Sequence, residues 1–236
     1  MAKQTRPRWL DRFAFLALTL MVAGVAGGFV RLLPALNAFY LFAVGGFLSC
    51  AMILAYLVRR LRGRAFGAAG VCALLGALTF GGTLALQPDA PPINDFTTDL
   101  GDPPLYDHAR TLPLNLGRDF SYPESFRPIQ EECCSDLAPL QSTAQAPEAF
   151  AAALEASYAM PLWKITSVIE ADGHIEAVAE TEIFGFRDDI VIRIRKSDTG
   201  SIVDMRSRSR DGRGDIGANA ARIRTWTSAY QRAAGE

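Results

Sequence analysis

LLPALNAFYLFAVGGFLSCAMILAYLV (residues 32–58) contains no charged residue, and a similar apolar stretch lies on each side of it. These neighbours are FAFLALTLMVAGVAGGFV (residues 13–30) and AFGAAGVCALLGALTFGGTLALQP (residues 65–88). Each stretch is long enough to cross the hydrocarbon core of a bilayer as a helix. We therefore predict a membrane anchor over residues 1–88, with three spanning helices at about residues 13–30, 36–58 and 66–86.

Basic residues flank these stretches unevenly. They are Lys3, Arg6, Arg8 and Arg12 before the first, Arg31 alone before the second, and Arg59, Arg60, Arg62 and Arg64 before the third. Lysine and arginine favour the cytoplasmic side of a membrane. We expect an integral protein of the bacterial cytoplasmic membrane, with a cytoplasmic amino terminus and with the residues after the third span on the extracytoplasmic, periplasmic side.

The first apolar stretch has a second interpretation, as a cleaved secretory signal, because a basic start leads into small residues at positions 23–26. We favour an uncleaved helix, since the stretch continues through residue 30. Small residues such as Gly24, Gly28, Gly45 and Gly46 let helices approach closely. They predict close helix packing and a surface for homo-oligomerisation.

Charge divides the chain into two parts. Residues 1–86 carry a net charge of +8, and residues 87–236 carry −9. The 150 residues of the second part suffice for one compact domain, and their acidity argues against a nucleic-acid partner. Residues 190–236 are basic, with a net charge of +5, so we expect an anion to bind at that end.

The extracytoplasmic residues 89–236 are predicted to form an α+β domain. Residues 89–145 are rich in proline but contain apolar side chains, so we expect them to wrap in extended form around residues 146–236. Alternation in twos predicts a four-stranded antiparallel meander over residues 163–170, 174–182, 190–195 and 201–208. Helices over residues 149–158 and about 216–232, the second behind an Asp215 cap, are expected on one face of the sheet.

The same alternation places carboxylates and guanidiniums in rows on one face of the meander. One interpretation is a solvent-facing ladder of ion pairs, and another is a platform that binds carboxylates or phosphates through arginine forks. The glycines at positions 212, 214 and 217 also allow an anion nest before the last helix, although Asp215 can cap the same amides.

Three stretches of this domain resemble the family known as domain of unknown function 1499 (DUF1499). They are Ile93–Asp99 with the following Pro103 and Pro104, Gly185–Asp189 leading to Arg193, and Asp204–Gly212 continuing through Asp215–Asn219 to Arg222 and Ile223. Two positions depart from the family pattern, since Gly214 replaces a usual serine and Cys133-Cys134 replaces a usual Tyr-Pro pair. The resemblance implies the fold and limits of the domain, and it implies no established activity.

We expect a non-enzymatic domain that binds an anionic envelope component or a partner protein through its arginine-rich end. One alternative is an enzyme for an anionic envelope substrate, with Asp188 or Asp189 as acid or base and arginines as a clamp. Another is a structural or assembly subunit. The candidate binding residues are Asn94, Asp95, Asp99, Asp188, Asp189, Arg193, Arg206, Arg208, Arg210, Asp215, Asn219 and Arg222. Among them we expect Arg206 to pair inside the domain and Arg210 to remain available to an external anion.

No cofactor, catalytic residue or metal site is predicted. The histidines His108 and His174 are far apart and lack the spacing of a zinc site. Cys133 and Cys134 are expected to be ordinary thiols or part of a structural bridge, and a disulfide between the two neighbours is the alternative.

Overall fold

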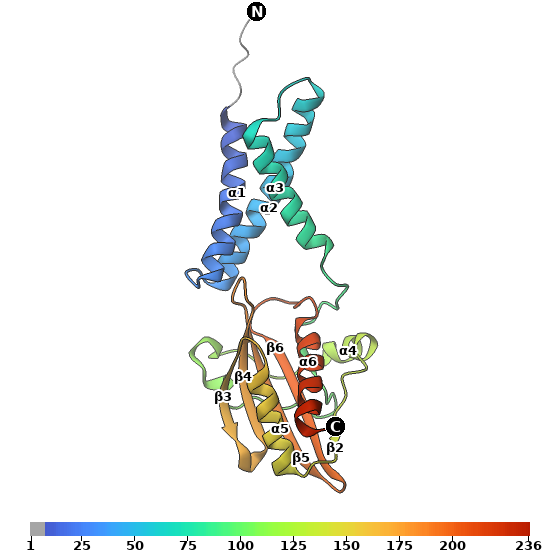
Figure 1. Cartoon of the computed structure of the whole chain (residues 1–236). Coiled ribbons are helices and arrows are strands. Elements are labelled where there is room, and N and C mark those ends of the chain that lie inside the picture. The colour runs from blue at the N-terminus through green and yellow to red at the C-terminus, as the bar shows by residue number, and fades with distance from the viewer. Residues whose placement is uncertain (1–7) are drawn as a thin grey trace, which may run out of the picture. The chain divides into compact units, whose positions relative to one another are not determined.

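The computed structural model describes residues 8–236, which divide into two compact units. The helical unit comprises the residues up to Gln87 together with Glu182–Gly185, and the sheet unit comprises Pro88–Thr181 and Phe186–Glu236. Figure 1 shows the elements of both units. Lys3 and Arg6, on which part of the predicted orientation depends, lie outside the described residues.

Three long helices form the helical unit: α1 (Arg8–Phe29), α2 (Ala35–Leu61) and α3 (Gly67–Ala85). All three are long and apolar enough to cross a membrane, which confirms the three predicted spans. Large apolar side chains such as Phe47 and Leu78 are exposed on their surfaces, as membrane-embedded helices require. The helices therefore indicate integration into a membrane.

Small residues allow α1 and α2 to pack closely. A Cβ atom on Gly24 would lie 2.5 Å from the Ala38 oxygen, and one on Gly45 would lie 2.6 Å from the Ala17 oxygen. These two glycines are thus used inside the helical unit of one chain. Homo-oligomerisation through the small residues stays a prediction.

The sheet unit contains a mixed fold of helices and one antiparallel sheet. Its strands are β1 (Asp95–Thr97), β2 (Leu140–Ser142), β3 (Trp163–Ile169), β4 (His174–Glu180), β5 (Arg187–Ser197) and β6 (Gly200–Ser209), in the order β1-β6-β5-β4-β3, with β2 also paired to β6. The meander β3 to β6 was predicted, but the predicted number of four strands is wrong. Both extra strands are three residues long, too short for alternation to reveal.

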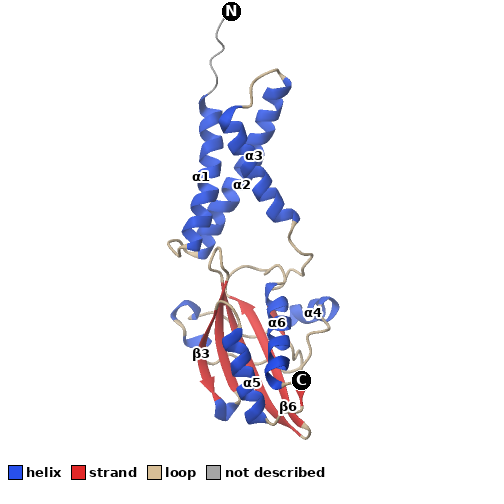
Figure 2. Cartoon of the chain, in the orientation of Figure 1, coloured by secondary structure: helices blue, strands red, loops and turns tan. Residues whose placement is uncertain are grey.

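Two helices, α5 (Ala146–Ala159) and α6 (Ala218–Ala234), cover the same face of the sheet, as Figure 2 shows. Their side chains build the apolar core together with that face, and Trp226 and Tyr230 of α6 are fully buried in it. Apolar side chains at a helical spacing on α5 and α6, and at every second position on the strands, explain this layer.

The proline-rich segment is more regular than the extended wrap that was predicted. It forms η1 (Ala109–Thr111), η2 (Pro113–Asn115), η3 (Glu124–Phe126) and α4 (Arg127–Cys133) in addition to β1 and β2. Proline suits the first turn of a helix, where its missing N–H leaves no hydrogen bond unmade, and Pro128 occupies that place in α4.

Candidate functional site

Most charged side chains of the central strands lie on one face of the sheet. Successive strand residues point to opposite faces, and the face toward α5 and α6 is apolar, with Ile190 and Met205 buried there. The opposite face, here the charged face, presents the carboxylates and guanidiniums of β4, β5 and β6. The register places Glu176 and Arg206 on either side of Val191, so the predicted rows do stand side by side.

The proline-rich segment covers the charged face. Tyr106 and Phe120 of that segment pack against Val191 of β5, and Glu176 and Asp204 are fully buried beneath it. The interpretation of a solvent-facing ladder of ion pairs is therefore wrong. The charged side chains are not exposed to solvent because the proline-rich segment places aromatic side chains over them and excludes water.

Arg206 is buried and holds Asp95 with two hydrogen bonds. Its Nε donates to Oδ1 at 2.9 Å and its Nη2 donates to Oδ2 at 2.7 Å. The same guanidinium donates to the backbone oxygens of Pro104 and Phe120 and lies 5.1 Å from the centre of the Tyr106 ring. Arg206 thus joins β1, β6 and the covering segment, and it is an internal partner as predicted.

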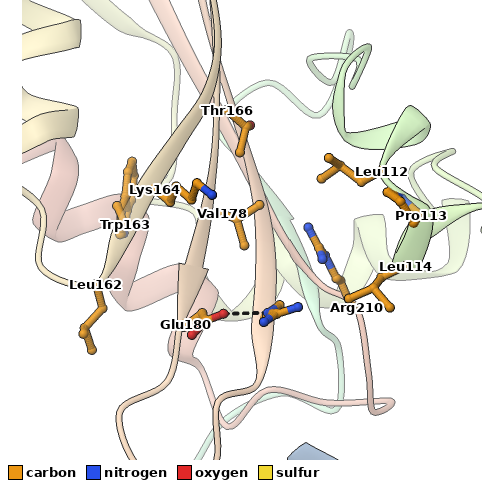
Figure 3. A pocket seen from close by; sticks show the side chains of 11 residues that line it. Leu112, Pro113, Leu114, Leu162, Trp163, Lys164, Thr166, Val178, Glu180 and Arg210 are labelled. Carbon is orange, nitrogen blue, oxygen red and sulfur yellow. Dashed lines mark hydrogen bonds and ion pairs between the residues drawn. The ribbon is translucent and has the colours of Figure 1, made fainter. Parts of the chain in front are cut away.

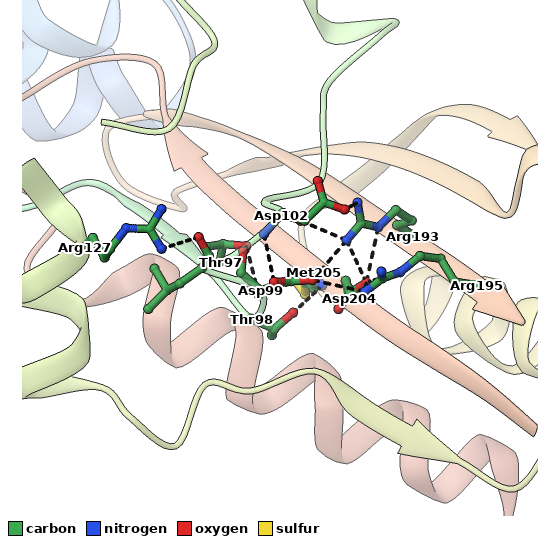
Figure 4. A network of polar contacts seen from close by, with 10 residues as sticks. Thr97, Thr98, Asp99, Asp102, Arg127, Arg193, Arg195, Asp204 and Met205 are labelled. Atoms are coloured by element: carbon green, nitrogen blue, oxygen red, sulfur yellow. Dashed lines mark hydrogen bonds and ion pairs between the residues drawn. The ribbon is translucent and has the colours of Figure 1, made fainter. Parts of the chain in front are cut away.

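A second cluster forms around Asp204 (Figure 4). Arg193 and Arg195 donate to its Oδ2 through Nη2, at 3.0 and 2.7 Å. Both arginines also donate to Asp99, and Arg193 reaches Asp102 at 2.9 Å. Three carboxylates therefore surround two guanidiniums, so the cluster leaves no surplus positive charge for an external anion.

Asp189 and Arg210 form a third pair. Nη2 of Arg210 donates to Oδ1 at 2.6 Å, and Asn115 donates to Oδ2 at 2.9 Å. Arg210 is only 8% exposed, so the expectation that it remains available to an external anion is wrong. Strand β6 continues to Ser209, one residue further than predicted, and this extension keeps Arg210 beside the buried carboxylate.

Asp188 lies on the other face of the sheet from Asp189. Arg222 of α6 donates to it at 2.6 Å and also donates to the Ser207 hydroxyl. Because neighbouring strand residues point to opposite faces, Asp188 and Asp189 cannot act together on one substrate. Each carboxylate also forms an ion pair with its own arginine, and this pairing weakens the alternative in which Asp188 or Asp189 acts as an acid or base.

Glu176 holds the covering segment through backbone amides, an arrangement that no sequence pattern indicated. Its carboxylate accepts hydrogen bonds from the N–H groups of Asp107, His108 and Ala109 at 2.6 to 2.9 Å, and it lies 2.8 Å from Nε2 of His174. Burial alone would raise the pKa of Glu176, but the hydrogen bonds from His174 and the three amides outweigh it and lower the pKa.

The turn before α6 is closed by its own side chains. Asp215 accepts hydrogen bonds from the N–H groups of Gly217 at 2.9 Å and Asn219 at 2.6 Å, so these two amides are not available to an external anion. The helix begins at Ala218, two residues later than predicted, and its N-cap is Gly217 instead of the predicted Asp215, which binds the first turn from two residues further back. Burial raises the pKa of Asp215 although these bonds oppose it. Asn94 donates to the Gly212 oxygen at 2.7 Å, so it fastens the same turn.

Arg208 differs from the other candidate arginines. Within residues 8–236 it forms no ion pair at hydrogen-bonding distance, and Nη1 donates to the backbone oxygen of Asp119. Its guanidinium stacks 4.4 Å from the centre of the Phe120 ring and is half-buried.

No pattern in the sequence indicated a role for Gln130 of α4. Its side chain accepts from the Thr97 N–H at 3.1 Å and donates to the Thr97 oxygen at 2.6 Å, so it continues the hydrogen bonding of the short edge strand β1. At the end of the same helix, Cys133 and Cys134 are joined as a disulfide, in place of the thiols that were expected. The helix α4 ends at Cys133, and Cys134 is its C-cap with a non-helical backbone, so the chain leaves the helix between the two cysteines.

A groove of about 540 Å³ lies between η2 and β3 (Figure 3). Leu112, Pro113 and Leu114 line one side, and Leu162, Trp163 and Lys164 line the other; Thr166, Val178, Glu180, Arg187 and Arg210 complete it. Of the twelve candidate residues, Arg210 lines this groove, and the others belong to the separate pairs, clusters and turn already described or, like Arg208, form no ion pair in the described residues. The structure therefore does not bring the candidates together into one site.

Two polar side chains that line the groove lack a hydrogen-bond or ion-pair partner within the described residues. Oγ1 of Thr166 is buried and has no hydrogen-bond partner among residues 8–236. Lys164 is exposed and forms no ion pair within the described part of the chain, whereas Arg187 is paired with Glu180 at 2.6 Å. Metal-ligating side chains do not cluster in threes anywhere in residues 8–236.

Comparison with protein families gave a match over the sheet unit. The model of a family described as protein of unknown function (DUF1499) matches residues 95–229, more than half of the chain. Comparisons with curated proteins and with solved structures gave no match.

Proposed function

The chain belongs to the DUF1499 family, and we propose that it is a membrane-anchored, non-enzymatic protein whose sheet unit binds an anionic envelope component or a partner protein. The groove between η2 and β3 is the proposed site. Its combination of exposed leucines and an exposed lysine without an ion pair in the described residues is the observation that carries the proposal.

The lining of the groove favours a ligand with an acidic group and an apolar part. Leu114 and Leu162 are 60% and 55% exposed on opposite sides, and apolar surface of this kind gains free energy when a ligand covers it. Lys164 is exposed in the groove and offers a cation to an acidic group. The two arginines that line the groove, Arg187 and Arg210, are held by Glu180 and Asp189 and form part of its wall.

A ligand screen with two matched variants tests this proposal. The full chain in neutral detergent is screened by thermal shift against phosphate- and carboxylate-bearing envelope components. Lys164→Glu reverses the charge in the groove, and Lys196→Glu reverses that of another exposed strand lysine outside it. We expect to find a component that raises the melting temperature of the wild type and of Lys196→Glu. The rise in these two proteins should be at least about three times the rise in Lys164→Glu. Equal shifts in the three proteins would contradict the proposed site.

A structural or assembly subunit is the second candidate. The observation that favours it is the internal bonding of the candidate residues, including the pair between Asp95 and Arg206. A screen without any stabilising component, combined with copurification of a second membrane protein, would favour this function.

The proposed orientation has a cytoplasmic amino terminus and an extracytoplasmic sheet unit in a bacterial cytoplasmic membrane. The basic residues between the second and third helices support it. In a cysteine-free variant, Asp89→Cys should react with an impermeant reagent in intact spheroplasts, and Arg62→Cys should not. Reversed labelling would exclude this orientation.

A further inference from the structure

Three side chains meet where the start of α1 approaches the end of α2. Tyr56 is buried, and its hydroxyl donates to Oδ1 of Asp11. The guanidinium of Arg59 stacks over the Tyr56 ring, with Cζ 5.3 Å from the ring centre. Cation–π stacking of this kind fixes a guanidinium in place without using its N–H groups.

Arg59 keeps donors that the chain does not satisfy. Its Nη1 lies 3.9 Å from Oδ1 of Asp11, which is too long for a hydrogen bond. Both Nε and Nη1 are shielded from solvent and lack a hydrogen-bond partner among residues 8–236. A charged donor without an acceptor costs free energy, and the Arg59 side chain keeps 14% of its surface exposed, so an acceptor from outside the chain can approach it and would stabilise this arrangement.

The neighbouring charges indicate what that acceptor is. Arg60 and Arg62 follow within one turn and are exposed, and this group of arginines ends a helix that is apolar enough to cross a membrane. Basic side chains next to a spanning helix attract anionic lipids. A guanidinium also matches a phosphate better than it matches a neutral headgroup, because it can donate two parallel hydrogen bonds.

We propose that Asp11, Tyr56 and Arg59 form a binding site for the phosphate of an anionic phospholipid headgroup. Arg59 is the ligating group, and Tyr56 holds its guanidinium by stacking. Asp11 binds the Tyr56 hydroxyl, and its carboxylate competes with the lipid for Arg59. The site is independent of the groove in the sheet unit, so either can fail without the other.

Native mass spectrometry of the full chain in neutral detergent measures the binding of phospholipids to this site. We expect phosphatidylglycerol to bind at least tenfold more tightly than phosphatidylcholine. Arg59→Gln should weaken phosphatidylglycerol binding by tenfold or more. Arg60→Gln is the matched control, because it removes one exposed charge in the next position, and should weaken binding by about fivefold or less. Equal losses in the two variants would overturn the site.

Two further variants keep the test informative if Arg59→Gln disturbs folding. Asp11→Asn retains an acceptor for the Tyr56 hydroxyl and removes the competing charge, so binding should become two- to fivefold tighter. In the double variant with Arg59→Gln this gain should vanish, whereas a gain that persists would overturn the role of Arg59. Inorganic phosphate at the lipid concentration should not displace the lipid, and displacement would overturn the assignment to a phospholipid.

Discussion

Replacing Arg206 with alanine should destabilise the sheet unit by about 4 kcal/mol. Breaking a buried ion pair costs about 3 to 5 kcal/mol, because the remaining charge stays buried without a partner. Arg206 is 1% exposed, and its loss also leaves the backbone oxygens of Pro104 and Phe120 without a donor. For a unit of about 150 residues, such a change should lower the melting temperature by about 8 to 16 °C.

Urea unfolding of the full chain in neutral detergent measures this loss. Trp226 is buried between α6 and the sheet and reports unfolding by fluorescence, and a Trp9→Phe background removes the signal of α1. Arg208→Ala is the matched control, because Arg208 lies two residues along the same strand and, among residues 8–236, forms a hydrogen bond to a backbone oxygen and stacks on a ring but makes no ion pair. Its loss should cost about 1 kcal/mol.

A double-mutant cycle with Asp95→Ala decides whether the ion pair itself carries the effect. If it does, the two single losses overlap, and the coupling free energy should be at least about 2 kcal/mol. A loss below about 1 kcal/mol in Arg206→Ala, or a coupling energy near zero, would refute the argument that this pair holds β1 and the covering segment on the sheet.

Three further outcomes follow from the other contacts. The folded-state pKa of Glu176 is lowered, so the stabilisation by its carboxylate is present above about pH 4.3 and is lost as the pH falls through the folded pKa. In urea unfolding, Glu176→Gln should therefore be less stable than the wild type at pH 7, and its stability should fall less than that of the wild type between about pH 5 and pH 3. Arg210→Ala should lose about 3 kcal/mol in urea unfolding because Asp189 stays buried, and an unchanged midpoint would show that the carboxylate finds another partner. A protein that begins at Pro147 lacks β1 and β2, and we expect a much lower melting temperature than for one that begins at Ala90; equal temperatures would make the proline-rich segment a linker.

Periodicity revealed the elements whose pattern is long. The three apolar stretches and the meander from β3 to β6 repeat one signal over many residues, and so their existence was predictable. The strands β1 and β2 and the helix α4 are short, and tertiary contacts determine them. The pairing of Gln130 with Thr97 is an example, because a glutamine side chain in sequence does not reveal which backbone it will meet.

The sequence revealed which residues carry charge but not which of them pair. Alternation correctly placed Arg206 among acids, yet the partner of Arg210 could not be found in this way, since the pair depends on how far β6 extends. The covering of the charged face could not be predicted either. It depends on Tyr106 and Phe120, two aromatic side chains in a segment without periodicity.

These contacts change what the family resemblance means for function. Arg206, Arg222 and Asp215 lie in the stretches that carry the resemblance, and each is bonded inside the domain. Paired charges beneath a cover specify which segment lies over which strand, because a buried charge without its partner is costly. The resemblance therefore describes how the domain holds together. Selectivity for a ligand is better sought at Leu114 and Lys164, which lie outside those stretches and line the groove.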